Sequence, residues 1–357
     1  MAVLAVLGAC QVQQRAARVS APSAAPWSDE VAVSVLKRAV NAEDGALRAQ
    51  AWDLWLASGH PSSDPVLARA VMDPSPMVQR ALAKAHAGRI GAELAKRSSL
   101  DPVAAAWLVL HGYSLASPKS DFWAVLYPAL AGETAAQGAL LDRMQDGVDV
   151  LEPGLVEVLG ASGIDGMAAA LVLAAQGAEP MLASELQLAA LGLGDVQAAE
   201  QLLSVDTPLE VGVWAIEVAV RQPSPAATDR LKRLARATDH PLQLHAQIGV
   251  VALRGDPSER FSEGLRHPDK DTRAWAAACM RSRALDRSVL REEIALLQGS
   301  ARDESTPVRV ESVKTLVDIV GVESVPLRPP SVGREVDHVD LIVAAEWLVH
   351  GQRSRSP

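Results

Sequence analysis

The residues whose types could support catalysis do not form a recognisable catalytic pattern along this 357-residue chain. The run Gly160-Ala161-Ser162-Gly163-Ile164 places a serine after a glycine, but it lacks the second glycine of a nucleophile elbow and no strand precedes it. Gly160, Gly163 and Gly166 are three residues apart, and a phosphate-binding loop would also need a preceding strand. We therefore predict a turn between helices at this point and no enzymatic activity.

The histidines do not predict a metal site. His240 and His245 are five residues apart, which is the wrong spacing for one face of a helix. His86 and His111 occupy equivalent positions of two repeated segments, so they are candidates to lie beside each other on adjacent helices. Packed side chains at the flank of a helix are the simpler expectation for both. We expect no metal and no other cofactor.

The thiol that the sequence singles out is Cys10, at the end of a short apolar run. Met1 to Ala9 is too short to span a bilayer, which takes about 20 residues, and it ends in small residues as a secretory signal does. The stretch Leu7-Gly8-Ala9-Cys10 resembles the lipobox of bacterial lipoproteins, which implies cleavage before the cysteine and acylation of its thiol. Residues 1–9 would then be a signal and residues 10–28 a flexible tether. Because no Lys or Arg precedes the apolar run, either the true start lies upstream or the run is not a signal.

The same resemblance implies a place in the cell. Gln11, rather than Asp, after the cysteine resembles lipoproteins that enteric bacteria sort to the outer membrane. The alternative is a cytoplasmic protein whose first 28 residues are disordered. The remaining thiol, Cys279, is predicted to be buried and inert because it falls on the inward face of its segment.

A turn followed by an amphipathic helix recurs along the chain, roughly every thirty residues. Each turn contains Asp or Pro, and the aliphatic residue after it is followed by small or apolar residues four and seven places on. Because those spacings put three residues on one face of a helix, the pattern predicts an all-α chain of stacked helices. The buried stripes are predicted to start at Leu47, Val78, Val103, Leu209, Leu242, Thr272 and Val308.

The turns also predict how the helices begin and which arginines can pair with a nearby Asp. Asp or Thr can accept the unpaired N–H groups of a helix start, and Pro fits its first position. An Arg after the aliphatic residue can reach an Asp across the turn. The expected helix starts are Asp73-Pro74, Asp101-Pro102, Thr207-Pro208 and Thr306-Pro307, and the bridging side chains are Arg48, Arg273 and Arg309.

Four of the repeated segments carry a family signature. Residues 43–58, 73–87, 268–282 and 303–319 resemble HEAT repeats, especially the bilin-lyase-like class, in which a turn Asp precedes Val-Arg and then Ala. The resemblance implies a right-handed α-α superhelix, a HEAT-like solenoid of about eight or nine helix pairs over residues 29–321. It also implies a binding scaffold, since most members are scaffolds and a few attach or modify cofactors. A Pro-rich break at 322–334 and a capping helix at 335–351 would follow.

The acidic charge of the chain is concentrated in its middle. The formal charge is −9, and residues 151–225 carry ten acidic side chains and a single Arg, whereas the flanking segments are close to neutral. Phosphate recognition needs clustered Lys and Arg, so nucleic acid is a poor partner and a basic protein is the better one. Trp55 and Trp107 fall on the buried stripe and should lie in the core. The residues predicted to contact a partner, on an acidic concave surface, are Glu210, Trp214, Glu217 and Trp275.

These features together predict a non-enzymatic, protein-binding scaffold. The leading hypothesis is a HEAT-repeat lipoprotein of the bacterial cell envelope, held at the membrane by lipid on Cys10. The alternative hypothesis is a cytoplasmic HEAT-like adaptor or a lyase-type protein that loads a cofactor.

Overall fold

The chain is helical where the structure describes it. In the computed structural model the described residues are 27–59, 63–115, 121–145, 151–254, 260–284, 291–322, 325–327, 329 and 335–353, and they contain no β-strand. Helices that follow one another pack against their neighbours. The prediction of an all-α fold is therefore confirmed.

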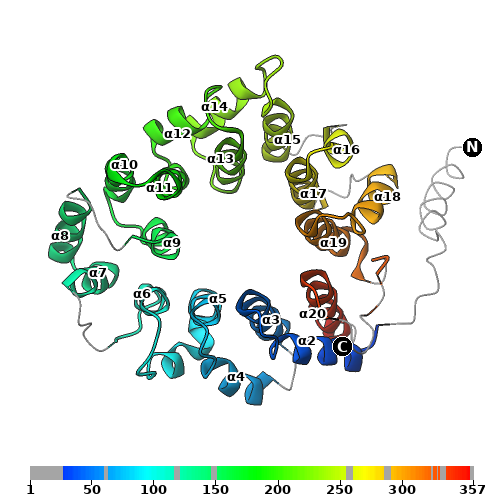
Figure 1. Cartoon of the computed structure of the whole chain (residues 1–357), viewed down its shortest axis with the longest axis horizontal. Helices are drawn as coiled ribbons and strands as arrows, with labels where there is room; N and C mark the ends of the chain where they lie inside the picture. Colours follow the sequence, from blue (N-terminus) through cyan, green and yellow to red (C-terminus); the bar gives the residue numbers. More distant parts are fainter. Residues whose placement is uncertain are drawn as a thin grey trace, which may run out of the picture.

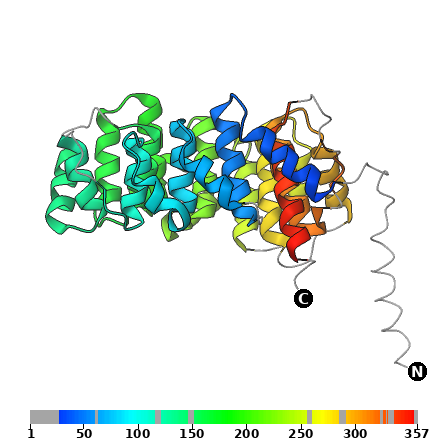
Figure 2. The ribbon, with the colours of Figure 1, turned by 90° about the horizontal axis from the view of Figure 1, so that it is seen from below.

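An inner row of helices forms a closed ring (Figure 1). Each helix of the row packs beside the next, and the last packs against the first. Seen edge-on, the ring is a band about one helix high (Figure 2). In order around the ring, the inner helices are α3 (Gly45–Ser58), α5 (Pro76–Leu94), α6 (Pro102–Leu110), α9 (Pro153–Ala161), α11 (Pro180–Gly192), α13 (Leu209–Arg221), α15 (Gln243–Arg254), α17 (Lys270–Ala284), α19 (Thr306–Val320) and α20 (His338–Arg353).

A second layer of helices surrounds the inner row (Figure 1). Most of its members pack on two helices of the inner row, so that the apolar faces of both layers are buried against each other. The outer helices are α2 (Asp29–Ala39), α4 (Ser63–Val71), α7 (Asp121–Leu130), α8 (Thr134–Gln145), α10 (Met167–Gly177), α12 (Val196–Leu202), α14 (Pro225–Leu234), α16 (Arg260–Leu265) and α18 (Arg291–Ser300).

Two irregularities interrupt the alternation of outer and inner helices. α5 bends at His86, whose backbone leaves the helical region (φ −128°, ψ 17°). After the bend it packs on the segment that follows α6, where the Tyr113 hydroxyl donates a hydrogen bond to the Ala87 carbonyl (2.6 Å). Farther on, α7 and α8 follow each other in the outer layer while α6 packs directly on α9. The turn signature of the sequence is weakest in this stretch.

The C-terminal helix closes the ring. α20 packs against α19, the preceding helix of the row, and also against α2 and α3 at the other end of the chain. Trp27 Nε1 donates a hydrogen bond to the Leu327 carbonyl (3.3 Å), and the side chains of His338 and Gln50 are hydrogen bonded. The helix predicted to cap one open end therefore covers both ends, because the two ends meet.

The predicted helix starts are correct at some turns and displaced at others. Asp101 accepts a hydrogen bond from the Ala104 N–H (3.0 Å) at the start of α6, whose first residue is Pro102. Asp73-Pro74 does not start a helix, because α5 begins two residues later, after Ser75. Two other starts are shifted by one residue: α13 follows Pro208 rather than Thr207, and α19 follows Ser305 rather than Thr306.

The buried stripe is in its predicted register in most inner helices, but not in α13. Val78, Leu242 and Val308 are fully buried as expected, whereas Leu209 is 52% exposed. Gly212 accounts for the difference: a Cβ at this position would lie 2.3 Å from a methyl carbon of Leu242, so the glycine allows α13 to pack closely on α15. The α13 helix is thereby rotated relative to the prediction.

Candidate functional site

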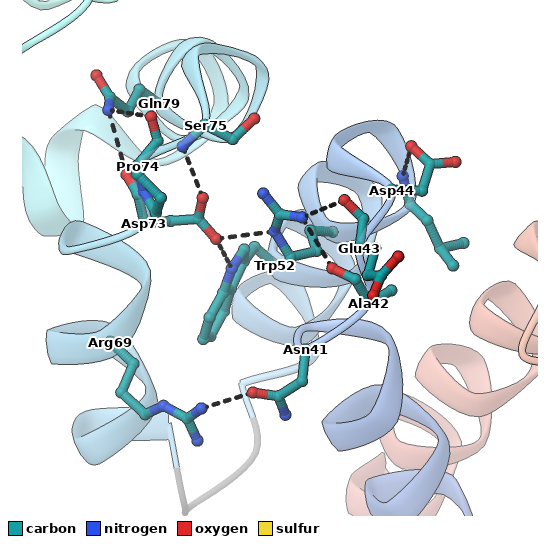
Figure 3. Close-up of polar contacts among 12 residues, drawn as sticks. Asn41, Ala42, Glu43, Asp44, Trp52, Arg69, Asp73, Pro74, Ser75 and Gln79 are labelled. Carbon is teal, nitrogen blue, oxygen red and sulfur yellow. Dashed lines mark hydrogen bonds and ion pairs between the residues drawn. The ribbon is translucent and has the colours of Figure 1, made fainter.

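The turn at Asp73 is the most highly connected polar site near the N-terminal end of the ring (Figure 3). One carboxylate oxygen accepts hydrogen bonds from Arg48 Nε (3.2 Å) and Trp52 Nε1 (3.3 Å), and the other accepts from the Ser75 N–H (2.9 Å). Arg48 also donates to the carbonyls of Ala42 (2.8 Å) and Glu43 (2.7 Å). The pairing of Arg48 with an Asp is as predicted, and the structure shows that this Asp belongs to the turn of the next repeat, so the arginine joins the two turns.

The same bridge recurs farther along the chain. Arg273 donates to both carboxylate oxygens of Asp303 (2.9 and 3.0 Å), thirty residues away, and to the carbonyls five and six residues before it. Arg309 binds the two equivalent carbonyls and lies 3.9 Å from the carboxylate of Asp337. Burial alone would raise the pKa of Asp303, but hydrogen bonds from Arg273 and Ser305 lower it overall.

One repeat divides this role between two residues. Gln79 stands where the other repeats have Arg, and its side-chain N–H₂ donates to the carbonyls of Asp73 (3.2 Å) and Pro74 (3.4 Å), again six and five residues back. The next residue, Arg80, makes the bridge to Asp101 (2.8 and 3.0 Å) and to Glu152 (2.8 Å). Because Asp73, Asp101 and Asp303 each bind an arginine and a backbone N–H, the turns form a connected framework that fixes the register of neighbouring repeats.

The histidines are not gathered into one site. His86 Nε2 lies 2.8 Å from an Asp53 carboxylate oxygen, whereas His111 stacks on Trp107 with the ring centroids 6.3 Å apart. His240 Nε2 contacts the Val205 carbonyl (2.9 Å). In the part of the chain that the structure describes, no three His, Cys, Asp or Glu side chains are placed to hold a metal ion.

The prediction that Trp275 contacts a partner is wrong. Its side chain is only 4% exposed and stacks flat on His245, with the ring centroids 5.3 Å apart. Its indole N–H donates to the His245 carbonyl (3.1 Å). Burial lowers the pKa of His245 to about 3, so the imidazole is neutral and serves as a flat apolar surface for the indole. Trp55 and Trp107, predicted to lie in the core, are buried.

The other three predicted contact residues lie on one exposed face of α13. Glu210, Trp214, Glu217 and Arg221 are spaced by four, three and four residues, which places them on one side of the helix. We call these four residues the α13 face. The opposite side, which includes Ala215 and Ala219, is buried. Since α13 packs against α11 and α15 along the row and against α12 and α14 outside it, the α13 face points to the inner side of the ring.

Trp214 is the exposed centre of this face. Its side chain is 49% exposed, whereas Trp27, Trp52, Trp55, Trp107 and Trp275 are at most 7% exposed. Sequence reasoning missed its apolar neighbours in the chain, Val205 and Leu209, which are 56% and 52% exposed. Leu209 was assigned to the core by its place in the repeat. Gly212, three residues on, is the sequence signal that could have shown the rotation of the helix.

Negative charge extends beyond the α13 face itself. Glu217 pairs with Arg221 (3.2 Å). Burial raises the pKa of Glu217, Arg221 lowers it, and the charges of Glu311 on α19 and Asp271 on α17 raise it further. Acidic groups of two other inner helices, α17 and α19, therefore act on the Glu217 carboxylate.

The acidic surplus of the middle segment is smaller in the fold than in the sequence. Glu152 pairs with Arg80, Glu157 with Lys84, and Glu200 with Arg230, and each of these cations comes from outside residues 151–225. Lys84 also lies over the Trp107 ring, 5.6 Å from its centroid. Within the described residues no ion pair reaches Glu210, so this carboxylate of the α13 face keeps its charge, as do other acids of the middle segment such as Asp165 and Asp206.

The two cysteines differ in what the structure says of them. Cys10 and the predicted signal and tether, up to residue 26, lie outside the described residues. Cys279 is buried in α17, as predicted, and burial raises the pKa of its thiol. None of the described helices combines the length and the apolar character needed to cross a membrane.

Comparison with known proteins gives no match. No family model, no curated protein and no solved structure is similar to this chain.

Proposed function

We propose that the ring is a HEAT-like solenoid, curved until its ends meet, and that it works as a non-enzymatic protein-binding scaffold. The observation that carries the proposal is the α13 face, where a half-exposed Trp214 stands between two acidic side chains on the inner side of the ring. Exposed Trp side chains are costly to leave in water and are frequent centres of protein interfaces. The charge beside it favours a basic partner.

We further propose that the scaffold is held in the bacterial cell envelope by lipid on Cys10. The support is the lipobox-like stretch before it, together with the small, polar and Pro-punctuated sequence of residues 11–28, which suits a tether between lipid and ring. Each buried CH₂ of an acyl chain contributes about 0.8 kcal/mol, so two or three chains would hold the protein firmly. Gln11 favours the outer membrane as the site of attachment.

Two experiments test the two parts separately. Metabolic labelling with palmitate should mark the wild-type protein and its Cys279→Ala variant, and the label should vanish in Cys10→Ala. Labelling that never appears, or that survives Cys10→Ala, contradicts the anchor and favours the cytoplasmic alternative. For the scaffold, a photo-crosslinking amino acid at position 214 should capture one partner in native cells, and the same amino acid at exposed position Met72 should not.

A further inference from the structure

We propose that the α13 face binds a cationic amphipathic helix of the partner protein, with an apolar side chain of that helix against Trp214 and basic side chains against Glu210 and Glu217. The proposal rests on the proposed function, because it names the kind of segment with which the partner binds. Four features of the face support it: its apolar centre, the spacing of its charges, the way α13 is packed and the negative charge around it.

The apolar centre supplies the anchor. Trp214 is about half exposed, and no described protein group accepts a hydrogen bond from its indole N–H. Leu209, the first residue of α13, and Val205, in the turn before it, are also exposed. Met181, at the start of the adjacent inner helix α11, is 68% exposed. A half-exposed Trp bordered by acidic groups is typical of the centre of an interaction site.

The spacing of the charges matches a helix. Glu210 lies about one helical turn before Trp214 and Glu217 about one turn after it, so the two carboxylates are about 10 Å apart along the axis. A partner helix with basic residues one turn either side of an apolar residue repeats this spacing. The remaining sides of α13 already pack against α11, α12, α14 and α15, and a further helix would continue the same kind of packing.

The surrounding charge selects a cation. The acidic groups that lie on the face, or are linked to it by charge interactions and ion pairs, are Glu210, Glu217, Asp271, Glu311 and Asp318, and the basic groups are Arg221, Arg281 and Lys314. Negative charge therefore exceeds positive charge by two. Arg281 and Lys314 already pair with Glu311, so they do not neutralise Glu210. A basic side chain near Glu217 would be attracted by Glu311 and Asp271 as well as by Glu217 itself.

The test uses the full chain and synthetic peptides of Leu and Lys. One peptide places its leucines every third or fourth residue, so that they fall on one face of a helix. A second has the same composition in strict alternation, and a third has Glu in place of Lys. Fluorescence anisotropy should show binding of the first peptide only, and its Kd should rise between 50 and 500 mM salt.

Variants of the chain locate the site. Trp214→Ala should weaken binding by at least about tenfold, and Glu210→Lys by about three- to tenfold, since both lie at the centre of the contact. The matched controls are Met72→Ala, another exposed apolar side chain, and Asp165→Lys, another exposed acid of the middle segment; each should change Kd by less than about twofold. All four positions are exposed, so unaltered thermal unfolding should accompany each result.

Equal binding of the alternating peptide, or equal effects of Trp214→Ala and Met72→Ala, overturns the proposal. If a partner is crosslinked at position 214 in cells but the peptide does not bind, the scaffold function is supported and the proposal of a cationic helical segment is wrong. Peptide binding lost in Trp214→Ala, together with no crosslinked partner, supports the chemistry of the face and counts against the scaffold function.

Discussion

Closure of the ring by α20 has a consequence that an open row of helices would not show. Helices α2 and α19 are almost 300 residues apart in sequence, yet both pack against α20. A defect in α20 should therefore loosen both ends of the chain. Leu341→Ala is a suitable defect, because Leu341 is fully buried in α20.

The expected size of the effect follows from the cavity that the substitution leaves. Replacing a buried Leu by Ala costs about 2–5 kcal/mol, because apolar contact is lost and the surroundings relax only in part. Suppose that about 3 kcal/mol of that cost weakens the contacts of α20 with α2, α3 and α19. Local opening of these helices then becomes more frequent by about a hundredfold, since 1.4 kcal/mol is a factor of ten. Hydrogen exchange measured by mass spectrometry should then show faster exchange in α2, α3, α19 and α20.

The control is Leu159→Ala, an equally buried leucine of α9 on another part of the ring. It should speed exchange around α9, α10 and α11 and leave α2 protected. The reasoning is refuted if Leu341→Ala speeds exchange in α19 alone, because α20 would then be an ordinary cap on one end of an open row. The reasoning is also refuted if Leu341→Ala speeds exchange in α2 no more than Leu159→Ala does.

Three further predictions concern stability. The pKa of His245 is lowered to about 3 in the fold, so the folded imidazole stays neutral while the unfolded chain gains a proton near pH 6.5. The free energy of unfolding should therefore fall by up to about 1.4 kcal/mol per pH unit below 6.5. Urea unfolding of His245→Phe should not show this dependence on pH. Arg273→Ala breaks a largely buried bridge and should cost about 1–3 kcal/mol in chemical denaturation, whereas Lys232→Ala, from an exposed pair, should change stability by less than about 0.5 kcal/mol. Gly212→Ala should cost about 1–3 kcal/mol in the same assay by overpacking against α15, while Gly138→Ala, with open space around it, should be neutral or slightly stabilising.

The features of the fold that could be predicted are those set by neighbouring residues. The spacing of apolar residues by four and seven predicted the helices, and the turn acids and arginines predicted that Arg48 and Arg273 pair with an Asp, although not that the Asp belongs to the next repeat. Each depends on one turn and its nearest neighbour. The depth of burial of Trp275 was missed because it depends on the stacked His245, which belongs to the preceding inner helix.

Two features could not be predicted from the average repeat because they depend on small rotations. In α13, the helix starts after Pro208 and packs closely at Gly212, so Leu209 is exposed rather than buried. Ring closure depends on the rotation between each pair of neighbouring helices, summed over the whole row. An error of a few degrees per repeat would leave the ends apart, and the stretch from α6 to α9, with two outer helices in succession, departs from the average repeat altogether.

Closure also bears on how the α13 face is presented. In an open row of repeats the helices at the ends are least protected and curvature can fluctuate, because each repeat contacts only its neighbours. In the ring, a change of curvature at one point must be matched elsewhere or the contacts of α20 with α2 and α3 must break. The α13 face lies away from those contacts, with α15, α17 and α19 between them along one arc. Its exposed Trp and acidic groups are therefore held in a fixed arrangement, which would lower the entropy lost on binding the partner that we propose.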